Sequence, residues 1–217
     1  MKDSFQTIAQ PTIGEYKEKG SKFIAYAFPV SSAEEWQSQL SFVKKEHPKG
    51  RHHCYAYRLG VDDTNFRAND DGEPSGTAGK PILGQLKSFA VTNVIVIVVR
   101  YFGGTLLGAS GLIHAYKTAT ADALQQAKII EQTISDIYRL TFDYAIMSNV
   151  MNAIKKCQLP MIHQDFGDIG KVDIAIRQSE VATTLPQLKA AIAKVPIEMI
   201  ADMETIEGLE LVYIETR

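Results

Sequence analysis

The chain has 217 residues, of which 45% are hydrophobic and 22% are charged, and its formal net charge is −2. This composition is typical of a globular protein that is long enough for two modest domains or one large one. The N-terminus is polar and the longest apolar run is the six residues Val94–Val99, so we expect neither a secretory signal nor a membrane span. Cys54 and Cys157 lie far apart and lack metal-type spacing, which is typical of reduced thiols in a cytoplasmic protein.

Charge is divided unevenly along the chain. Residues 1–130 contain 15 Lys and Arg against 12 Asp and Glu, whereas residues 131–217 contain 8 against 13. The first part is mildly basic and the second is acidic, which favours an anionic partner for the first part alone. We expect two domains, 1–130 and 137–217, and the acidic second domain could contact a protein partner.

Strand and helix patterns alternate through the first domain. Ser32 and Glu35 resemble a capping box, in which side chains at a helix start bond backbone N–H groups. Arg51–Leu59 alternates as a strand that places His53 on one face and His52 on the other. The predicted strands are 12–18, 22–30, 51–59, 64–68 and 94–101, and the predicted helices are 32–46, 82–89 and 110–128, with a polar, glycine-rich loop at 69–81.

The run Val94–Leu112 is the most informative part of the chain. Its β-branched residues predict a strand that is buried on both faces. A glycine-rich turn follows, and a helix is expected to open at about Ala109 or Ser110, where unpaired backbone N–H groups favour an anion. The residues that would build this phosphate site are Gly103, Gly104, Gly108, Ser110 and Gly111. Alternatively, the glycines only permit close packing of strand and helix.

The turn falls one residue short of a nucleotide-hydrolysis site. Gly103–Ser110 reads G-G-T-L-L-G-A-S, which fits the frame G-x-x-x-x-G-K-[ST] except that Ala109 replaces the lysine. Without that charge the turn could hold a phosphate but would poorly stabilise a departing one. The sequence therefore argues against an NTPase.

Arg51, His52 and His53 form the first candidate motif. One imidazole beside Arg51 could bind phosphate when it is protonated, and RNA affinity would then fall between pH 6 and 8. Alternatively, the histidines are hydrogen-bonded residues of the core. Nearby aromatic side chains that could stack on bases, or belong to the core, are Tyr55, Tyr57, Tyr101 and Phe102.

An acidic loop forms the second motif, with Asp70, Asp71 and Glu73. Three carboxylates could hold Mg²⁺, but Asp-Gly and Glu-Pro are also typical of turns, which is the favoured interpretation, and we predict no metal.

Two cations could serve the glycine turn from neighbouring segments. Lys80 precedes Pro81 and is expected to be extended, which would let its ammonium group reach an anion. Arg100 ends the buried strand and could fork onto a phosphate or pair with Asp70 or Asp71.

The second domain is predicted to be βαββαβ. Strands are expected at 138–144, 161–166 and 171–177, with further strand-like segments at 197–206 and 209–215, and helices at 149–157 and 181–194. This order is typical of a ferredoxin-like fold, so the whole chain is predicted to be α+β.

Three motifs, kept in order and spacing, carry a resemblance: Arg51–Cys54, Asp70–Pro81 and Arg100–Gly108. Together they resemble the signature of the YigZ/IMPACT family. The resemblance implies a first domain with the fold of domain IV of elongation factor G and a ferredoxin-like second domain resembling its domain V. It also implies a role linked to translation, chiefly through nucleic-acid or ribosome contact.

We expect a non-enzymatic protein that binds RNA or the ribosome and uses no cofactor. The phosphate site would combine the glycine turn with Arg51, His52, His53, Lys80 and Arg100. The alternative is a small-molecule enzyme, a phosphotransferase or hydrolase, that uses the same turn with the two motifs. Ser75 and Ser110 supply nucleophile types, but the G-x-S-x-G spacing of a nucleophile elbow is missing.

Overall fold

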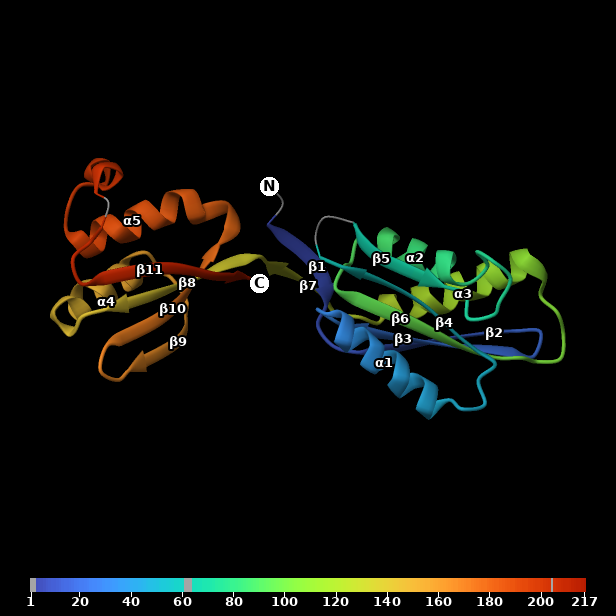
Figure 1. Ribbon diagram of the computed structural model, residues 1–217. Coiled ribbons are helices and arrows are strands. Elements are labelled where there is room, and N and C mark those ends of the chain that lie inside the picture. Colours follow the sequence, from blue (N-terminus) through green and yellow to red (C-terminus); the bar gives the residue numbers. More distant parts are fainter. Residues whose placement is uncertain (1–2, 61–63, 204) are drawn as a thin grey trace. The chain divides into compact units, whose positions relative to one another are not determined.

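The chain divides into two compact units in the computed structural model, which describes residues 3–60, 64–203 and 205–217 (Figure 1). The first unit is Ser4–Gln132, and the second is Thr133–Arg217 together with Asp3. The expected range 1–130 places Asp3 in the first domain. In the structure, the Asp3 carboxylate accepts hydrogen bonds from Arg177 Nε at 2.7 Å and Nη2 at 3.2 Å, which ties it to the second unit.

The first unit is built on a five-stranded sheet in the order β2-β3-β6-β4-β5, with every neighbouring pair antiparallel. The strands are β2 (Thr12–Glu18), β3 (Ser21–Pro29), β4 (His52–Leu59), β5 (Asn65–Asn69) and β6 (Val94–Tyr101). All residues of β6 except Tyr101 are buried, as the β-branched run predicts, because β6 is the central strand and helices cover both faces.

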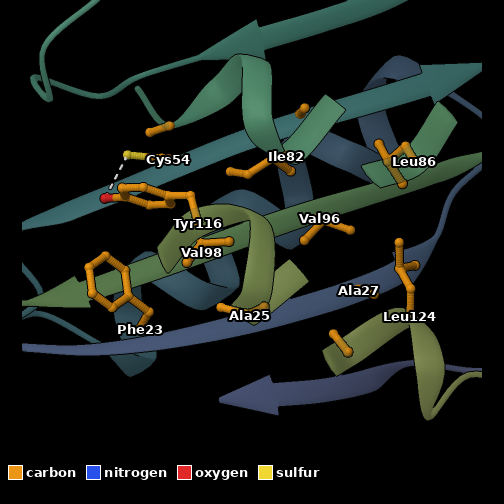
Figure 2. Packing of buried hydrophobic residues seen from close by; sticks show 14 of the residues in the cluster. Phe23, Ala25, Ala27, Cys54, Ile82, Leu86, Val96, Val98, Tyr116 and Leu124 are labelled. Atoms are coloured by element: carbon orange, nitrogen blue, oxygen red, sulfur yellow. Dashed lines mark hydrogen bonds between the residues drawn. The ribbon is translucent and has the colours of Figure 1, made fainter. Parts of the chain in front are cut away.

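Three helices pack on this sheet. Helices α2 (Gly79–Ser88) and α3 (Gly108–Gln125) lie on one face and α1 (Ala33–Glu46) lies on the other (Figure 1). The face of α2 and α3 holds the larger apolar cluster, in which Tyr116 of α3 packs edge-on against Phe23 of β3 (Figure 2). The helices therefore bury complementary sets of side chains from alternating strand positions.

Helix α1 begins as predicted. Ser32 Oγ accepts a hydrogen bond from the Glu35 N–H at 3.2 Å. The returning bond goes to Ser31 instead of Ser32, because the Glu35 carboxylate accepts from the Ser31 N–H at 2.6 Å.

The other two helices start earlier than predicted. Helix α2 begins at Gly79 instead of residue 82, and α3 begins at Gly108 and ends at Gln125. A short strand β7 (Ile129–Thr133) follows α3 and pairs with β1 (Ser4–Ile8), which the sequence analysis did not predict. Pro81 falls in the first turn of α2, where its missing N–H has no intrahelical partner to lose.

The second unit has the predicted order of elements: β8 (Ser135–Phe142), α4 (Met147–Lys156), β9 (Met161–Phe166), β10 (Gly170–Arg177), α5 (Val181–Ala193) and β11 (Leu209–Thr216). The strands form one sheet in the order β11-β8-β10-β9, with antiparallel neighbours. Short 3₁₀ helices occur at η1 (Tyr144–Ile146) and η2 (Gln178–Glu180). The chain is thus a mixed α+β protein of two units, and its likeness to elongation factor G stays a prediction.

One predicted strand of this unit is wrong. Residues 197–202 form a third 3₁₀ helix, η3 (Ile197–Asp202), because the Pro196 carbonyl accepts a hydrogen bond from the Met199 N–H at 3.1 Å and so starts a turn. Across the described residues, no helix is both long and apolar enough to cross a membrane.

Candidate functional site

Four loops of the first unit meet at one end of its sheet. In the strand pairing, Arg100 at the end of β6 lies opposite His52 of β4 and Phe23 of β3. The turn between β2 and β3 touches the loop after β6, because Gly20 contacts Gly103. This end therefore brings together chain segments that lie up to 83 residues apart in the sequence.

A buried ion pair forms the floor of this end. Arg100 is 5% exposed and Glu73 is 8% exposed, and Arg100 Nη1 donates to Glu73 Oε1 at 2.6 Å. The Tyr116 hydroxyl donates to the same oxygen at 2.9 Å, and Cys54 Sγ lies 3.3 Å from that hydroxyl (Figure 2). Of the two alternatives for Arg100, the ion pair with Asp70 or Asp71 is not the one formed, because its partner is Glu73 and the other two carboxylates accept from backbone N–H groups.

Burial changes the acidity of two groups around this floor. Burial raises the pKa of the Tyr116 hydroxyl, with further contributions from Cys54 and Glu73. It also raises the pKa of the Cys54 thiol, although the hydrogen bond to Tyr116 opposes the shift. Both groups are therefore protonated at neutral pH, and Cys54 lacks the thiolate character of a nucleophile.

The acidic loop acts through its hydrogen bonds to backbone. Asp70 accepts from the N–H groups of Gly76 at 2.9 Å, Ala78 at 3.0 Å and Gly79 at 2.8 Å. Burial alone would raise the pKa of Asp70, but these bonds and the nearby Lys80 charge outweigh it and hold the pKa below its usual range. Asp70 thus caps the start of α2 from nine residues away, in the manner of an N-cap side chain.

Asp71 continues the same turn. Its φ of +42° and the φ of +87° at Gly72 are left-handed conformations, and its carboxylate accepts from the His53 N–H at 2.7 Å. This geometry is that of a turn held by Asx-type bonds. Within the described residues no group of three or more His, Cys, Asp or Glu side chains is arranged to hold a metal ion.

The two histidines lie on opposite faces of β4, as strand alternation predicts. His52 Nδ1 lies 2.8 Å from the Asp71 carbonyl, which can only accept, so Nδ1 carries the proton. His52 Nε2 is then directed toward Glu73 Oε1, 3.9 Å away. His53 Nε2 instead bonds the His47 carbonyl at 3.1 Å, and burial lowers the pKa of His53. His52 reaches the site, whereas His53 supports the other face.

The glycines of the turn differ in what they do. A Cβ on Gly103 would overlap the backbone of Gly20 and Ser21, so close packing requires this glycine. Gly104 and Gly108 have φ of +86° and +73°, which favour glycine, and a Cβ on either would meet open space among the described residues. In the described chain, α3 begins without a side-chain cap or an acidic residue in its first turn. Its first N–H groups are therefore open to an acceptor.

A cavity of about 330 Å³ opens beside this helix start. Of the predicted site residues it brings together Arg51, His52, Glu73, Arg100 and Gly108. The remaining lining residues are Gly72, Pro74, Phe102, Leu106, Leu107, Ala109 and Leu112. The predicted residues that do not line it are His53, Asp70, Asp71, Lys80, Gly103, Gly104, Ser110 and Gly111.

Lys80 lies away from the cavity lining, and its expected contact with an anion stays a prediction. The extended conformation predicted before Pro81 is wrong, because Lys80 lies in the first turn of α2 and its side chain approaches Gly76. Leu106 and Tyr116 are residues of this end that the sequence did not single out as site residues. Tyr116 occupies an ordinary core position of a helix, and no local signal distinguishes it from its neighbours.

Comparison with known proteins places the chain in a family. A family model for the Impact N-terminal domain matches residues 19–124. IMPACT family member YvyE of Bacillus subtilis (strain 168) is 36% identical over 158 residues, which cover 73% of each chain. IMPACT family member YigZ of Escherichia coli (strain K12) is 33% identical over 182 residues, covering 83% of this chain and 89% of YigZ. The chain belongs to the IMPACT family.

Solved structures resemble the fold of the chain, and the family match covers the residues of the cavity. A crystal structure described as that of a hypothetical protein superposes with a TM-score of 0.71 at 30% identity and covers 99% of each chain. A two-domain translational regulator, Yih1, covers 56% of this chain at 28% identity, with a TM-score of only 0.34. The Impact N-terminal match contains every residue of the cavity, from Arg51 to Leu112. The site thus lies wholly within the part that defines this chain as an IMPACT protein.

Proposed function

We propose that this IMPACT family protein binds RNA or the ribosome, without consuming a cofactor, in the regulation of translation. Phosphate groups would contact the first turn of α3 and Arg51, at the end of the sheet where the four loops meet. A role linked to translation is what the family resemblance implies.

The distribution of charge at this end carries the proposal. Lys44, Lys45, Lys49 and Arg51 are all exposed, on the end of α1 and the segment that leads into β4. Part of this charge is offset, because the Asp71 carboxylate lies 4.0 Å from the Lys44 ammonium group, whereas Glu73 is paired with the buried Arg100. Lys45, Lys49 and Arg51 lie outside these two pairs. An anionic polymer would therefore meet a positively charged surface beside an uncapped helix start.

Arg100 takes a different role from the one that its position in the sequence indicates. Because it is buried and paired with Glu73, it supports the floor of the cavity, and Arg51 is the arginine exposed to a phosphate. We further propose that the two units correspond to domains IV and V of elongation factor G. The βαββαβ order of the second unit and its antiparallel sheet support that correspondence.

Co-sedimentation with ribosomes and their subunits, at low and high salt, tests this function. The variant Lys45→Ala/Lys49→Ala/Arg51→Ala should weaken binding and reduce the slope of log affinity against log salt by about 0.7–0.9 for each phosphate contact removed. The matched control is Lys155→Ala/Lys156→Ala/Lys189→Ala, which removes three charges from the second unit and should leave the slope unchanged.

Two results would contradict the proposal. If the folded protein does not co-sediment at any salt concentration, a small-molecule ligand or an enzymatic activity becomes the function to pursue. If both triple variants lose the same affinity, binding reflects net charge and the predicted end of the sheet is not the contact.

A further inference from the structure

The cavity of the first unit is large enough to hold one nucleotide. Its volume of about 330 Å³ lies within the range of small-molecule sites in proteins. Its walls come from four segments: the start of β4, the acidic loop, the end of β6 with the glycine turn, and the start of α3. The cavity is thus built by the tertiary structure and is more than a helix terminus.

Two large apolar side chains stand exposed at its rim. Phe102 is 40% exposed and Leu106 is 84% exposed, and both line the cavity. Leu106 follows the glycine turn, and in this position it buries little of its apolar surface. Exposed aromatic and aliphatic groups that line a concave site are typical of surfaces that bind an apolar or planar ligand.

Arginine side chains flank the aromatic ring. The guanidinium carbons of Arg51 and Arg100 each lie 5.5 Å from the centre of the Phe102 ring. Arg100 is held by its ion pair with Glu73, whereas Arg51 is exposed to solvent. Arg100 Nε is buried and has no hydrogen-bond partner in the described part of the chain, so one donor at this wall is unused.

The polar and apolar walls therefore match the two halves of a nucleotide. The uncapped first turn of α3, with Gly108 and Ala109 at the cavity, and the cation of Arg51 suit a phosphate. Phe102 and Leu106 offer apolar surface to the face of a base. Every base has a π-face that can stack on an aromatic ring, so such a contact would not depend on the base sequence.

We propose that this cavity binds a single nucleoside phosphate unit, with its base against Phe102 and Leu106 and its phosphate at the start of α3 beside Arg51. The inference rests on the proposed RNA-binding function when the unit is an unpaired nucleotide of an RNA strand. The same chemistry is offered by a free mononucleotide, and the experiment separates the two sources.

The experiment measures the affinity of the full chain for a fluorescently labelled 12-nucleotide RNA, as a single strand and as a duplex, in one buffer. Phe102→Ala should weaken binding of the single strand by about 5- to 150-fold and leave duplex binding unchanged, because a paired base cannot enter the cavity. The matched control Phe102→Tyr keeps the ring and should retain the affinity. Adenosine monophosphate is added as a competitor in a separate titration.

Each outcome separates the inference from the proposed function. If Phe102→Ala weakens single-strand binding and adenosine monophosphate displaces the RNA, the cavity accepts both an RNA nucleotide and a free mononucleotide. If Phe102→Ala weakens binding but adenosine monophosphate displaces nothing, the cavity accepts a nucleotide of RNA alone. If Phe102→Ala, folded by circular dichroism, binds the single strand as the wild type does, the inference is wrong, while salt-dependent RNA binding would still support the proposed function. If no RNA binds but adenosine monophosphate binds the wild type and not Phe102→Ala, the cavity assignment stands and the proposed function fails.

Discussion

The buried pair of Arg100 and Glu73 yields a prediction that depends on which partner is removed. Glu73→Leu leaves a guanidinium group buried without its carboxylate, and arginine cannot lose its proton at any ordinary pH. Removing one partner of a buried ion pair costs about 3–5 kcal/mol of stability. We therefore expect Glu73→Leu to lower the free energy of unfolding of the first unit by that amount at both pH 7 and pH 5.

Removing the arginine has a different pH dependence. In Arg100→Met the remaining carboxyl group can take up a proton, which at pH 7 costs an ordinary glutamic acid about 3.7 kcal/mol, since its unperturbed pKa is about 4.3 and each unit is about 1.36 kcal/mol. At pH 5 the same protonation costs only about 1 kcal/mol. The destabilisation by Arg100→Met should therefore shrink markedly between pH 7 and pH 5.

The double variant Glu73→Leu/Arg100→Met removes both charges together. Its main loss is the acceptor of the Tyr116 hydroxyl, which costs about 1–3 kcal/mol for a buried polar group. The double variant should therefore be more stable than Glu73→Leu alone, even though it carries one more substitution.

Urea unfolding followed by tryptophan fluorescence measures these effects. The single tryptophan, Trp36, lies in the first unit, where its ring centre is 5.6 Å from that of Tyr55 and 4.9 Å from that of Tyr57, so it reports on that unit alone. The reasoning is refuted if Glu73→Leu and the double variant unfold at the same urea concentration, or if Arg100→Met loses as much stability at pH 5 as at pH 7.

The same unfolding assay tests three further predictions. Gly103→Ala should lower stability by about 3 kcal/mol or more, because the added Cβ would overlap backbone atoms. The Cβ of Gly104→Ala would meet open space among the described residues, so this variant should cost only about 1–2 kcal/mol, for the left-handed conformation. Equal losses in the two variants would exclude the close contact at Gly103. Asp70→Asn should cost about 1–3 kcal/mol at pH 7, because both carboxylate oxygens accept from N–H groups and the amide NH2 that replaces one of them cannot accept. Folding lowers the pKa of Asp70, so the stability that its carboxylate contributes is present above about pH 4 and is lost as the pH falls through the folded pKa. The difference in stability between Asp70→Asn and the wild type should therefore disappear in acid. A difference that stays constant with pH would argue against the carboxylate as the cap. Tyr116→Phe should cost about 1.5–3 kcal/mol through the lost bond to Glu73, and no loss would show that this bond contributes nothing net.

Features that depend on near neighbours in the chain could be predicted from the sequence. The β-branched run of β6 becomes the buried central strand, and Ser32 caps α1 through Glu35 three residues later. The alternation of β4 separates His52 from His53. In each case the repeat of the backbone itself decides where a side chain points, so the pattern is sufficient.

Other features required knowledge of which loops share one end of the sheet. Arg100 and Glu73 are 27 residues apart, and Gly20 and Gly103 are 83 residues apart, yet each pair is in direct contact. These contacts follow from the antiparallel order β2-β3-β6-β4-β5, because it places the start of β4 and the end of β6 at the same end of the sheet. By itself, the sequence determined the family resemblance and most of the elements, although β1, β7 and the 3₁₀ helix η3 were not among those predicted. Only the tertiary structure decided that Arg100 is a buried support and that Phe102 stands at an open cavity, because burial depends on neighbours that the chain brings together through folding.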